Sequence, residues 1–288
     1  MRQSQVYREL SSKIAGAAAL LLIGAIFCHA EDARALVARA VATDDHSYRL
    51  ALNYTYKIHD EIQELNAAGG VKSVHSTLDE VLYIGGKRYF RPLEKDDKAI
   101  PEKEARKEQA KLDRAAAEAS RLSEAEHARR IEDEERDIAK RRAQFRDVPD
   151  AFDYRLIGDA VIAGRSAWEI SARPRAGYHG AMRGILRNVE GTLWIDKQDC
   201  SWVKFEADVL NPFSLGWFLA RVAEGTHLSY ELMPVGTPGK DEFWVPKNIS
   251  LKASARLALV RKVNVEQKIT FSDYRKFQSD SRIVSADE

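Results

Sequence analysis

The chain has 288 residues, of which 45 are Lys or Arg and 44 are Asp or Glu, so its formal net charge at pH 7 is +1. A balance this close to neutral predicts no polyanionic partner and therefore no nucleic acid. Two cysteines exclude a disulfide-rich scaffold and a thiolate metal cluster.

The chain begins with the layout of a secretory signal peptide over residues 1–30. Three basic residues precede the apolar run Ile14–Phe27, which is 14 residues long, and Ala30 offers a cleavage position before an acidic pair. A helix that crosses a membrane needs about 20 residues, so cleavage is favoured over an uncleaved anchor. The remaining chain, residues 31–288, has 42 basic and 43 acidic residues and a single cysteine. The sequence therefore predicts a protein of the periplasm or cell envelope.

A helix and three strands are expected before residue 100. Residues 32–43 have the apolar spacing of an amphipathic helix. Residues 48–59 alternate between apolar and polar side chains, which predicts a half-buried strand. A second strand is expected over residues 71–84, and the pair Gly85-Gly86 turns the chain into a third strand over residues 87–92.

The composition changes sharply in residues 101–147, which hold 13 basic and 13 acidic residues and a single aromatic residue. This segment cannot form a core, but its helix propensity is high. Ser123 and Glu126 have the spacing of a capping box, so we expect two helices, arranged as a hairpin, with a break near residues 120–123. The segment is interpreted as a charged helical insertion that is either solvated or packed against the body or a partner.

Strand patterns resume after Pro149 and continue to the end of the chain. Nine or ten antiparallel strands in all, each apolar on one face, predict an α+β fold that is mainly β. Such a sheet must curl around something, either helices or a ligand. Residues 31–288 are therefore expected to form one domain, interrupted by the insertion.

No catalytic signature is found along the chain. The motifs of zinc proteases, serine hydrolases, phosphate-binding loops and dinucleotide-binding folds are all missing from the sequence. Asp196 and Asp199 are expected to be hairpin turn residues. The sequence predicts no enzyme, no cofactor and no metal site.

Two groups of residues are candidates for binding. Aromatic and apolar side chains of the strands, and of the run that follows residue 212, would line a cavity or form its lid. The members of this group are Phe213, Leu215, Trp217, Phe218, Trp194 and Phe205. Whether the run after residue 212 is a lid or a plug of the core stays open. A loop with four arginines could receive a phosphate or carboxylate head group: Arg173, Arg175, Arg183 and Arg187.

Three stretches resemble the outer-membrane lipoprotein-sorting (LolA-like) proteins and their relatives in the LolB and RseB/MucB superfamily. They are "DAFDYRLIGDAVIAGRSAWEISARPR", "GTLWIDKQDCSWVKFEADV" and "EFWVPKNISLKAS". The resemblance is clear over residues 150–277 and weaker over residues 33–90, and the insertion departs from it. It implies a strongly curved, open half-barrel sheet with helices on its concave side around an apolar cavity. In that superfamily the cavity takes lipoprotein acyl chains or senses lipid-type ligands.

The expected function is that of a non-catalytic envelope protein. It would bind a lipid, an acyl chain or a lipidated protein in the half-barrel, for transport or sensing, with peripheral membrane contact. The alternative is a periplasmic scaffold with a filled core, which would contact an envelope protein partner through residues 101–147.

Overall fold

The computed structural model describes residues 32–215, 220–257 and 261–276. The chain divides into two units, Met1–Asp32 and Ala33–Glu288, and all the elements named below belong to the second unit. The expected signal peptide lies outside the described residues. No helix within the described ranges is both long and apolar enough to cross a membrane.

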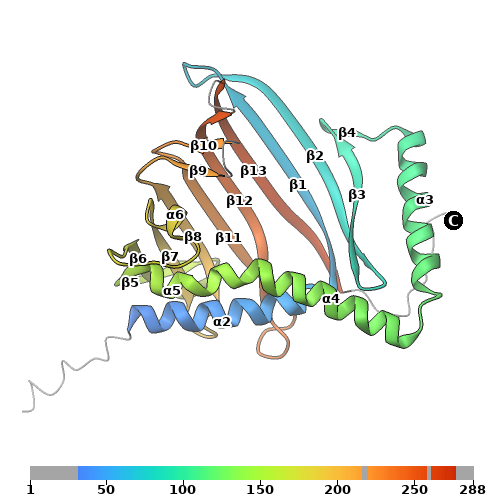
Figure 1. The fold of residues 1–288 in the computed structure, drawn as a ribbon, viewed down its shortest axis with the longest axis horizontal. Coiled ribbons are helices and arrows are strands. Elements are labelled where there is room, and N and C mark those ends of the chain that lie inside the picture. The colour runs from blue at the N-terminus through green and yellow to red at the C-terminus, as the bar shows by residue number, and fades with distance from the viewer. Residues whose placement is uncertain (1–31, 216–219, 258–260, 277–288) are drawn as a thin grey trace, which may run out of the picture. The chain divides into compact units, whose positions relative to one another are not determined.

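One antiparallel sheet forms the body of this unit (Figure 1). Its strands are β1 (Tyr54–Leu65), β2 (Val71–Ile84), β3 (Lys87–Lys95), β4 (Lys98–Ala99), β5 (Phe152–Ile162), β6 (Arg165–Pro174), β7 (Val189–Asp196), β8 (Trp202–Val209), β9 (Phe213–Leu215), β10 (Ala220–Val222), β11 (His227–Val235), β12 (Phe243–Leu257) and β13 (Arg261–Lys276). The strand order is β4-β3-β2-β1-β13-β12-β11-β8-β7-β6-β5, and β10 pairs with β12 and β9. The end strands β4 and β5 do not pair with each other, so the sheet is open. The expected α+β fold with an open antiparallel sheet is confirmed, although its 13 strands exceed the nine or ten expected.

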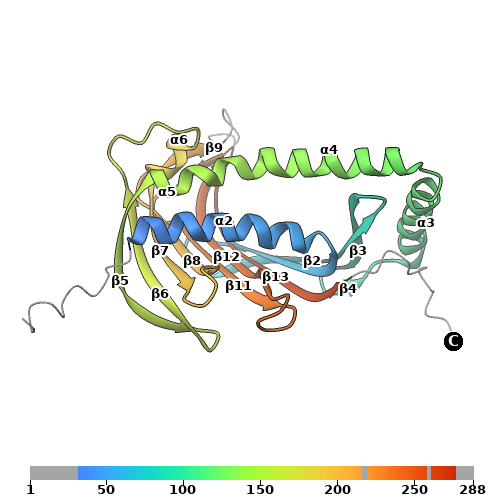
Figure 2. The ribbon, with the colours of Figure 1, turned by 90° about the horizontal axis from the view of Figure 1, so that it is seen from below.

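Helix α2 (Ala33–Ala51) lies across one face of the sheet, called here the inner face (Figure 2). Leu36 and Val37 of α2 form a buried cluster with Ile170 of β6 and Ile195 of β7. The apolar stripe of the helix thus meets the apolar alternation of the strands, as amphipathic patterns require.

The expected strand over residues 48–59 is wrong in its first part, because α2 continues to Ala51 and β1 begins only at Tyr54. Leu50 and Ala51 pack against a buried cluster that includes Phe243. Ser47 is buried, and its hydroxyl accepts a hydrogen bond from the backbone N–H of Trp244 at 3.5 Å. These tertiary contacts favour the helix over a local alternation that suits a strand.

The insertion forms α3 (Glu102–Ala119), α4 (Glu124–Arg142), a short 3-10 helix η1 (Ala143–Asp147) and α5 (Val148–Ala151). The capping box is present, since the Ser123 hydroxyl accepts from the Glu126 N–H and the Glu126 carboxylate accepts from the Ser123 N–H. Helices α3 and α4 do not lie side by side as in the expected hairpin: α3 stands beside the β3–β4 end of the sheet, whereas α4 runs next to α2 (Figures 1 and 2).

The two insertion helices lie on opposite faces of β2 and β3. Arg91 pairs with Glu80 across the strands and donates to Gln109 of α3 at 3.2 Å, so α3 lies on the outer face. Tyr83 points to the other face, where burial is the largest cause of its raised pKa and Glu134 of α4 is the smallest. The insertion therefore passes around the edge of the sheet.

The Gly85-Gly86 turn lies in the angle between α3 and α4. Gly85 has φ +56°, and a Cβ atom there would come within 2.6 Å of the Ala119 Cβ. A β-hairpin turn at this place needs a residue that tolerates positive φ and has no side chain.

The β5–β8 end of the sheet has a bulged strand and a buried ion pair. Residues 152–162 form one strand, β5, which has a bulge between Leu156 and Gly158. Asp196 begins the β7–β8 turn and is buried, and Arg165 donates to both of its carboxylate oxygens at 2.8 and 3.1 Å.

Candidate ligand-binding face

A row of side chains crosses the inner face from β5 to β2. Residues directly opposite each other in an antiparallel pair have their side chains on the same face. The register therefore places in one row Leu156, Ile170, Leu193, Phe205, Tyr230, Ile249, Ile269, Asp60 and Thr77. The row is apolar or aromatic from β5 to β13 and becomes polar at β1 and β2.

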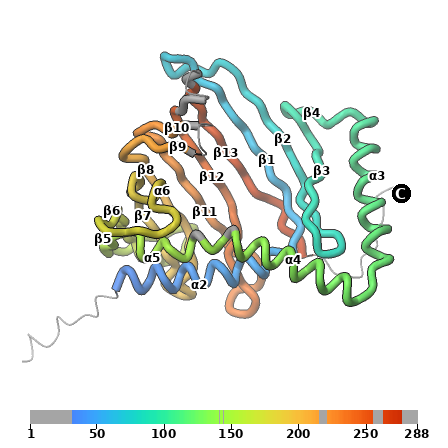
Figure 3. The backbone as a smooth tube through the Cα atoms, viewed as in Figure 1, coloured from blue at the N-terminus to red at the C-terminus, as the bar shows by residue number. Residues whose placement is uncertain are grey.

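The row is covered by α2 at one end, and no helix of the described residues covers its middle. Ile170, under α2, has an exposed fraction of 0 %. Ile249 and Ile269 are only half-buried, and Ile62 in the next row on β1 is 37 % exposed. Strands β1, β2 and β13 continue well beyond α2 and α4 (Figures 1 and 3). The middle of the inner face is thus an apolar surface with water access.

A cluster of tyrosines lies beside this surface, close to α2. The rings of Tyr56 and Tyr274 are stacked with centroids 5.1 Å apart, and Tyr56 also contacts Phe271 at 6.2 Å. Tyr230 stacks on Phe205 at 5.0 Å. Burial raises the pKa of Tyr56, Tyr230 and Tyr274. These hydroxyls stay protonated near neutral pH and can donate hydrogen bonds.

Helix α4 is fastened to α2 beside the tyrosines. Arg142 donates to Asp45 at 2.7 Å and to Asp44, and its guanidinium lies 4.7 Å from the centre of the Tyr48 ring. Burial raises the pKa of Asp44 more than Arg142 lowers it. Ile138, one turn earlier on α4, is buried with 5 % exposed. This contact holds the insertion against the body at its C-terminal end.

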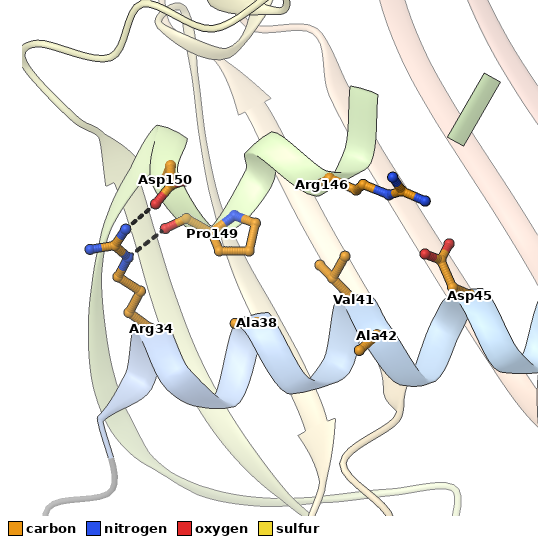
Figure 4. Close-up of a pocket in the computed structure, with 8 residues that line it drawn as sticks. All are labelled: Arg34, Ala38, Val41, Ala42, Asp45, Arg146, Pro149 and Asp150. Atoms are coloured by element: carbon orange, nitrogen blue, oxygen red, sulfur yellow. Dashed lines mark hydrogen bonds and ion pairs between the residues drawn. The ribbon is translucent and has the colours of Figure 1, made fainter. Parts of the chain in front are cut away.

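A groove of about 450 Å³ separates α2 from the η1–α5 segment (Figure 4). Ala38, Val41 and Pro149 give it an apolar floor. Arg34 closes one end by donating to the Pro149 carbonyl at 3.1 Å and to Asp150. Charged side chains of both signs line its ends, which is typical of a seam between two surface elements.

The residues expected to line the cavity do not all share one surface. Phe205 lies on the inner face, in the row described above. Trp194 is directly opposite Lys204, whose ammonium lies 5.0 Å from its ring, and both belong to the outer face because Leu193 and Phe205 belong to the inner one. Phe213 is half-buried at the start of β9 and pairs with Val222 of β10.

The rest of the apolar run is only partly described. The backbone of Leu215 pairs with that of Ala220, which joins β9 to β10. Trp217 and Phe218 lie outside the described residues.

The four arginines expected to form a head-group loop do not converge on one point through any contact in the described structure. Arg175 donates to Asp153 at 2.9 Å, and Arg173, whose side chain is 80 % exposed, lies 3.9 Å from Glu190. Arg183 and Arg187 are exposed on and after the short helix α6 (Arg183–Leu186). The loop is held by Tyr178, which is buried and donates to Asp147 at 3.0 Å.

The described residues include no group of three or more His, Cys, Asp or Glu side chains that could hold a metal ion. The tyrosine cluster was missed from the sequence as a group, because its members come from β1, β11 and β13. The available signal was the recurrence of tyrosine on the apolar side of strands, for example at Tyr54 and Tyr56.

No family model matches the chain, and no curated protein matches it either. A lipoprotein-sorting protein domain from Vibrio parahaemolyticus is similar in structure, with 12 % identity, a TM-score of 0.32, and 84 % of this chain and 94 % of that chain covered. A LolA superfamily protein from Nitrosomonas europaea has 9 % identity and a TM-score of 0.31, with 86 % and 95 % covered. The Pseudomonas aeruginosa MucA/MucB complex has 11 % identity and a TM-score of 0.25, with 83 % and 93 % covered.

Similarity at this level carries no conclusion about a ligand or a partner of this chain. The architecture itself, an open antiparallel sheet with helices over its inner face, is the one that the hairpin motifs predicted. The chain therefore has the open antiparallel sheet, with helices over its inner face, that the resemblance implied.

Proposed function

We propose that this protein is a non-catalytic component of the bacterial cell envelope that binds a lipid, an acyl chain or a lipidated protein. The observation that carries the proposal is the uncovered middle of the inner face. Leu228, Leu251, Ile249 and Ile269 are neighbours there by register, and each is half-buried. An apolar surface of this kind, left open to water, is unfavourable in a free protein and marks a binding site.

The chemistry of an acyl chain suits this surface. Each methylene removed from water contributes about 0.8 kcal/mol, so a chain laid along the strands gains affinity without directed polar contacts. The leucine and isoleucine side chains of the neighbouring strands β11, β12 and β13 offer such a chain a continuous apolar track. The protein would then transport or sense its ligand, and no chemical step is required of it.

Binding is tested with a fluorescent fatty acid and with native mass spectrometry of the purified mature protein. The variant Leu251→Glu places a charge on the inner face, and Ser250→Glu places the same charge one residue away on the exposed outer face. We expect the first variant to lose the probe and the second to keep it, with both folded by circular dichroism. Equal binding by both variants would contradict the proposal.

Export is part of the proposal and has its own test. We propose that residues 1–30 are a cleaved signal peptide and that the protein acts in the periplasm. N-terminal sequencing of the protein from an envelope fraction should begin at Glu31. A chain that retains its first residues and stays in the cytoplasm would contradict this.

A second candidate function is that of an interaction protein that uses the insertion. Phe145 is 52 % exposed and Ile131 is 38 % exposed, so the insertion presents apolar side chains to water. If Phe145→Ser abolishes assembly with an envelope protein while the fatty-acid probe still binds, the scaffold function is favoured.

A further inference from the structure

Arg88 occupies a distinctive place on the inner face. It is the second residue of β3, directly opposite Tyr83 of β2, and it is half-buried. Its side chain hydrogen-bonds the Tyr56 hydroxyl, and its guanidinium lies 5.4 Å from the centre of the Phe90 ring. A guanidinium has five N–H donors, and these contacts use few of them.

Three other half-buried arginines are paired with carboxylates. Arg91 pairs with Glu80, Arg142 with Asp44 and Asp45, and Arg165 with Asp196 and Glu242. Arg88 differs, because no carboxylate oxygen of a described residue lies within 4.0 Å of it. A partly buried charge without an opposite charge is unfavourable unless something else supplies one.

The surroundings of Arg88 suit an anion. Burial lowers the pKa of Arg88, but Tyr83, Tyr56 and Tyr48 together raise it more, and burial raises the pKa of the Tyr56 hydroxyl. Protonated hydroxyls and a guanidinium together form the charge-assisted hydrogen bonds that bind carboxylate and phosphate groups. Two acids lie on the inner face beside this track, Asp79 directly opposite Ile58 and Asp60 in the row, and Glu134 of α4 makes the smallest contribution to the raised pKa of Tyr83.

The apolar track of the inner face leads directly to this point. Tyr56 and Ile58 are two residues apart on β1, and Ile58 is directly opposite Phe271 of β13. Phe271 is two residues from Ile269, which belongs to the uncovered row. A chain that leaves the row at Ile269 and follows Phe271 and Ile58 would therefore end beside Tyr56 and Arg88.

We propose that Arg88, with the hydroxyls of Tyr56 and Tyr48, binds the carboxylate or phosphate group of an amphiphile whose apolar chain lies along Ile58, Phe271 and Ile269. This inference rests on the proposed lipid-binding function and specifies its ligand class. It also places the anionic group at the β3 side of the sheet, away from the arginine loop between β6 and β7.

The first experiment needs no variant. Binding of laurate, dodecyl phosphate, dodecanol and dodecyltrimethylammonium to the mature protein is measured by calorimetry below their aggregation concentrations. We expect both anions to bind at least about tenfold more tightly than dodecanol, and the cation to bind no more tightly than dodecanol. Equal affinities for anion and alcohol would overturn the inference and leave the proposed function standing, whereas no binding of any probe would overturn both.

Variants then locate the anion site. Arg88→Gln should remove the preference for laurate over dodecanol while dodecanol binds as before, and Arg88→Lys should keep part of the preference. The double variant Arg183→Gln, Arg187→Gln tests the rival arginine loop and should bind like the wild type. A preference that survives Arg88→Gln, or that disappears in the loop variant instead, would overturn the assignment.

Two further experiments test what determines the preference for an anionic head group. Glu134→Gln removes the facing negative charge and should strengthen laurate binding without changing dodecanol binding. Inorganic phosphate alone should compete with laurate and not with dodecanol if the site takes a free anion as well as an amphiphile. Competition with dodecanol would mean that the anion acts elsewhere, which contradicts the inference.

Discussion

The two parts of the inner face share one sequence pattern and have different surroundings. At the β5–β8 end, Ile170 and Ile195 are packed under α2 and have no exposed surface. In the middle, Ile249 and Ile269 lie on strands with the same alternation and are directly opposite each other, but both are only half-buried. Alternation therefore states which face a side chain occupies, and the helices decide whether that face is covered.

The largest expected effect separates these two parts by stability. Ile170→Ala should lower the free energy of unfolding by about 2–5 kcal/mol, because it leaves a cavity in a closed cluster. Ile249→Ala should cost less than half as much, since its side chain already contacts water. Urea unfolding followed by circular dichroism measures both, and equal losses would show that the middle of the face is as closed as its end.

The next effect concerns the ion pair that anchors the covered end. Asp196 has a side chain only 1 % exposed and accepts from Arg165 and from the N–H groups of Gln198 and Asp199. Burial raises its pKa, but these hydrogen bonds and the charge of Arg165 lower it more, so the pKa lies below the usual 3.8. Asp196→Asn should cost about 1.5–3 kcal/mol near neutral pH.

The pH dependence of this variant follows from the sign of that shift. A carboxyl whose pKa is lower in the folded state stabilises the fold above its unfolded pKa and loses this contribution as the pH falls through its folded pKa. The difference in unfolding free energy between wild type and Asp196→Asn should therefore shrink below about pH 4. A difference that is constant from pH 7 to pH 3 would argue against the ion pair.

A smaller effect tests how the insertion is seated at the far end of the sheet. Gly85→Ala should cost about 1–3 kcal/mol, because it combines positive φ with a close approach to Ala119. Adding Ala119→Gly should recover the steric part only. Gly158→Ala is the control, since nothing lies within 4 Å of a Cβ atom there. Equal thermal stability of Gly85→Ala and the wild type would mean that α3 and α4 do not pack around this turn.

The smallest effect concerns the start of α4. Ser123→Ala removes a helix cap and should cost about 1 kcal/mol or less. Hydrogen exchange should increase in the first turn of α4 and remain unchanged in α2. Ser120→Ala, at the end of α3, is the matched control, and equal exchange in both variants would contradict the role of the cap.

Much of the fold could be predicted because its signals are local. The strand over residues 71–84, the glycine turn that follows it and the capping box at Ser123 all lie within short stretches with ordinary turn and cap chemistry. The helix end at Ala51 could not be predicted, since Phe243 and Trp244, nearly 200 residues later, decide it. The angle between α3 and α4 depends on the sheet edge in the same way.

The candidate site was predicted less completely than the fold. Of the residues expected to line the cavity, Phe205 lies on the inner face, whereas Trp194 occurs in an equally apolar stretch and lies on the other face; their part in binding stays a prediction. No sequence pattern pointed to Arg88, because it is a binding candidate only through its place on the inner face and the absence of a carboxylate partner among the described residues.

The sequence by itself determined most of the secondary-structure types, the α+β class and the hairpin turns, since these depend on period, turn chemistry and short-range spacing. Only the tertiary structure decided which apolar residues form a closed core and which line an open face. It also decided that the insertion passes from the outer to the inner face, and that Arg88 lies among tyrosines at the end of the apolar track. Each of these depends on contacts between segments far apart in the chain, which no local pattern records.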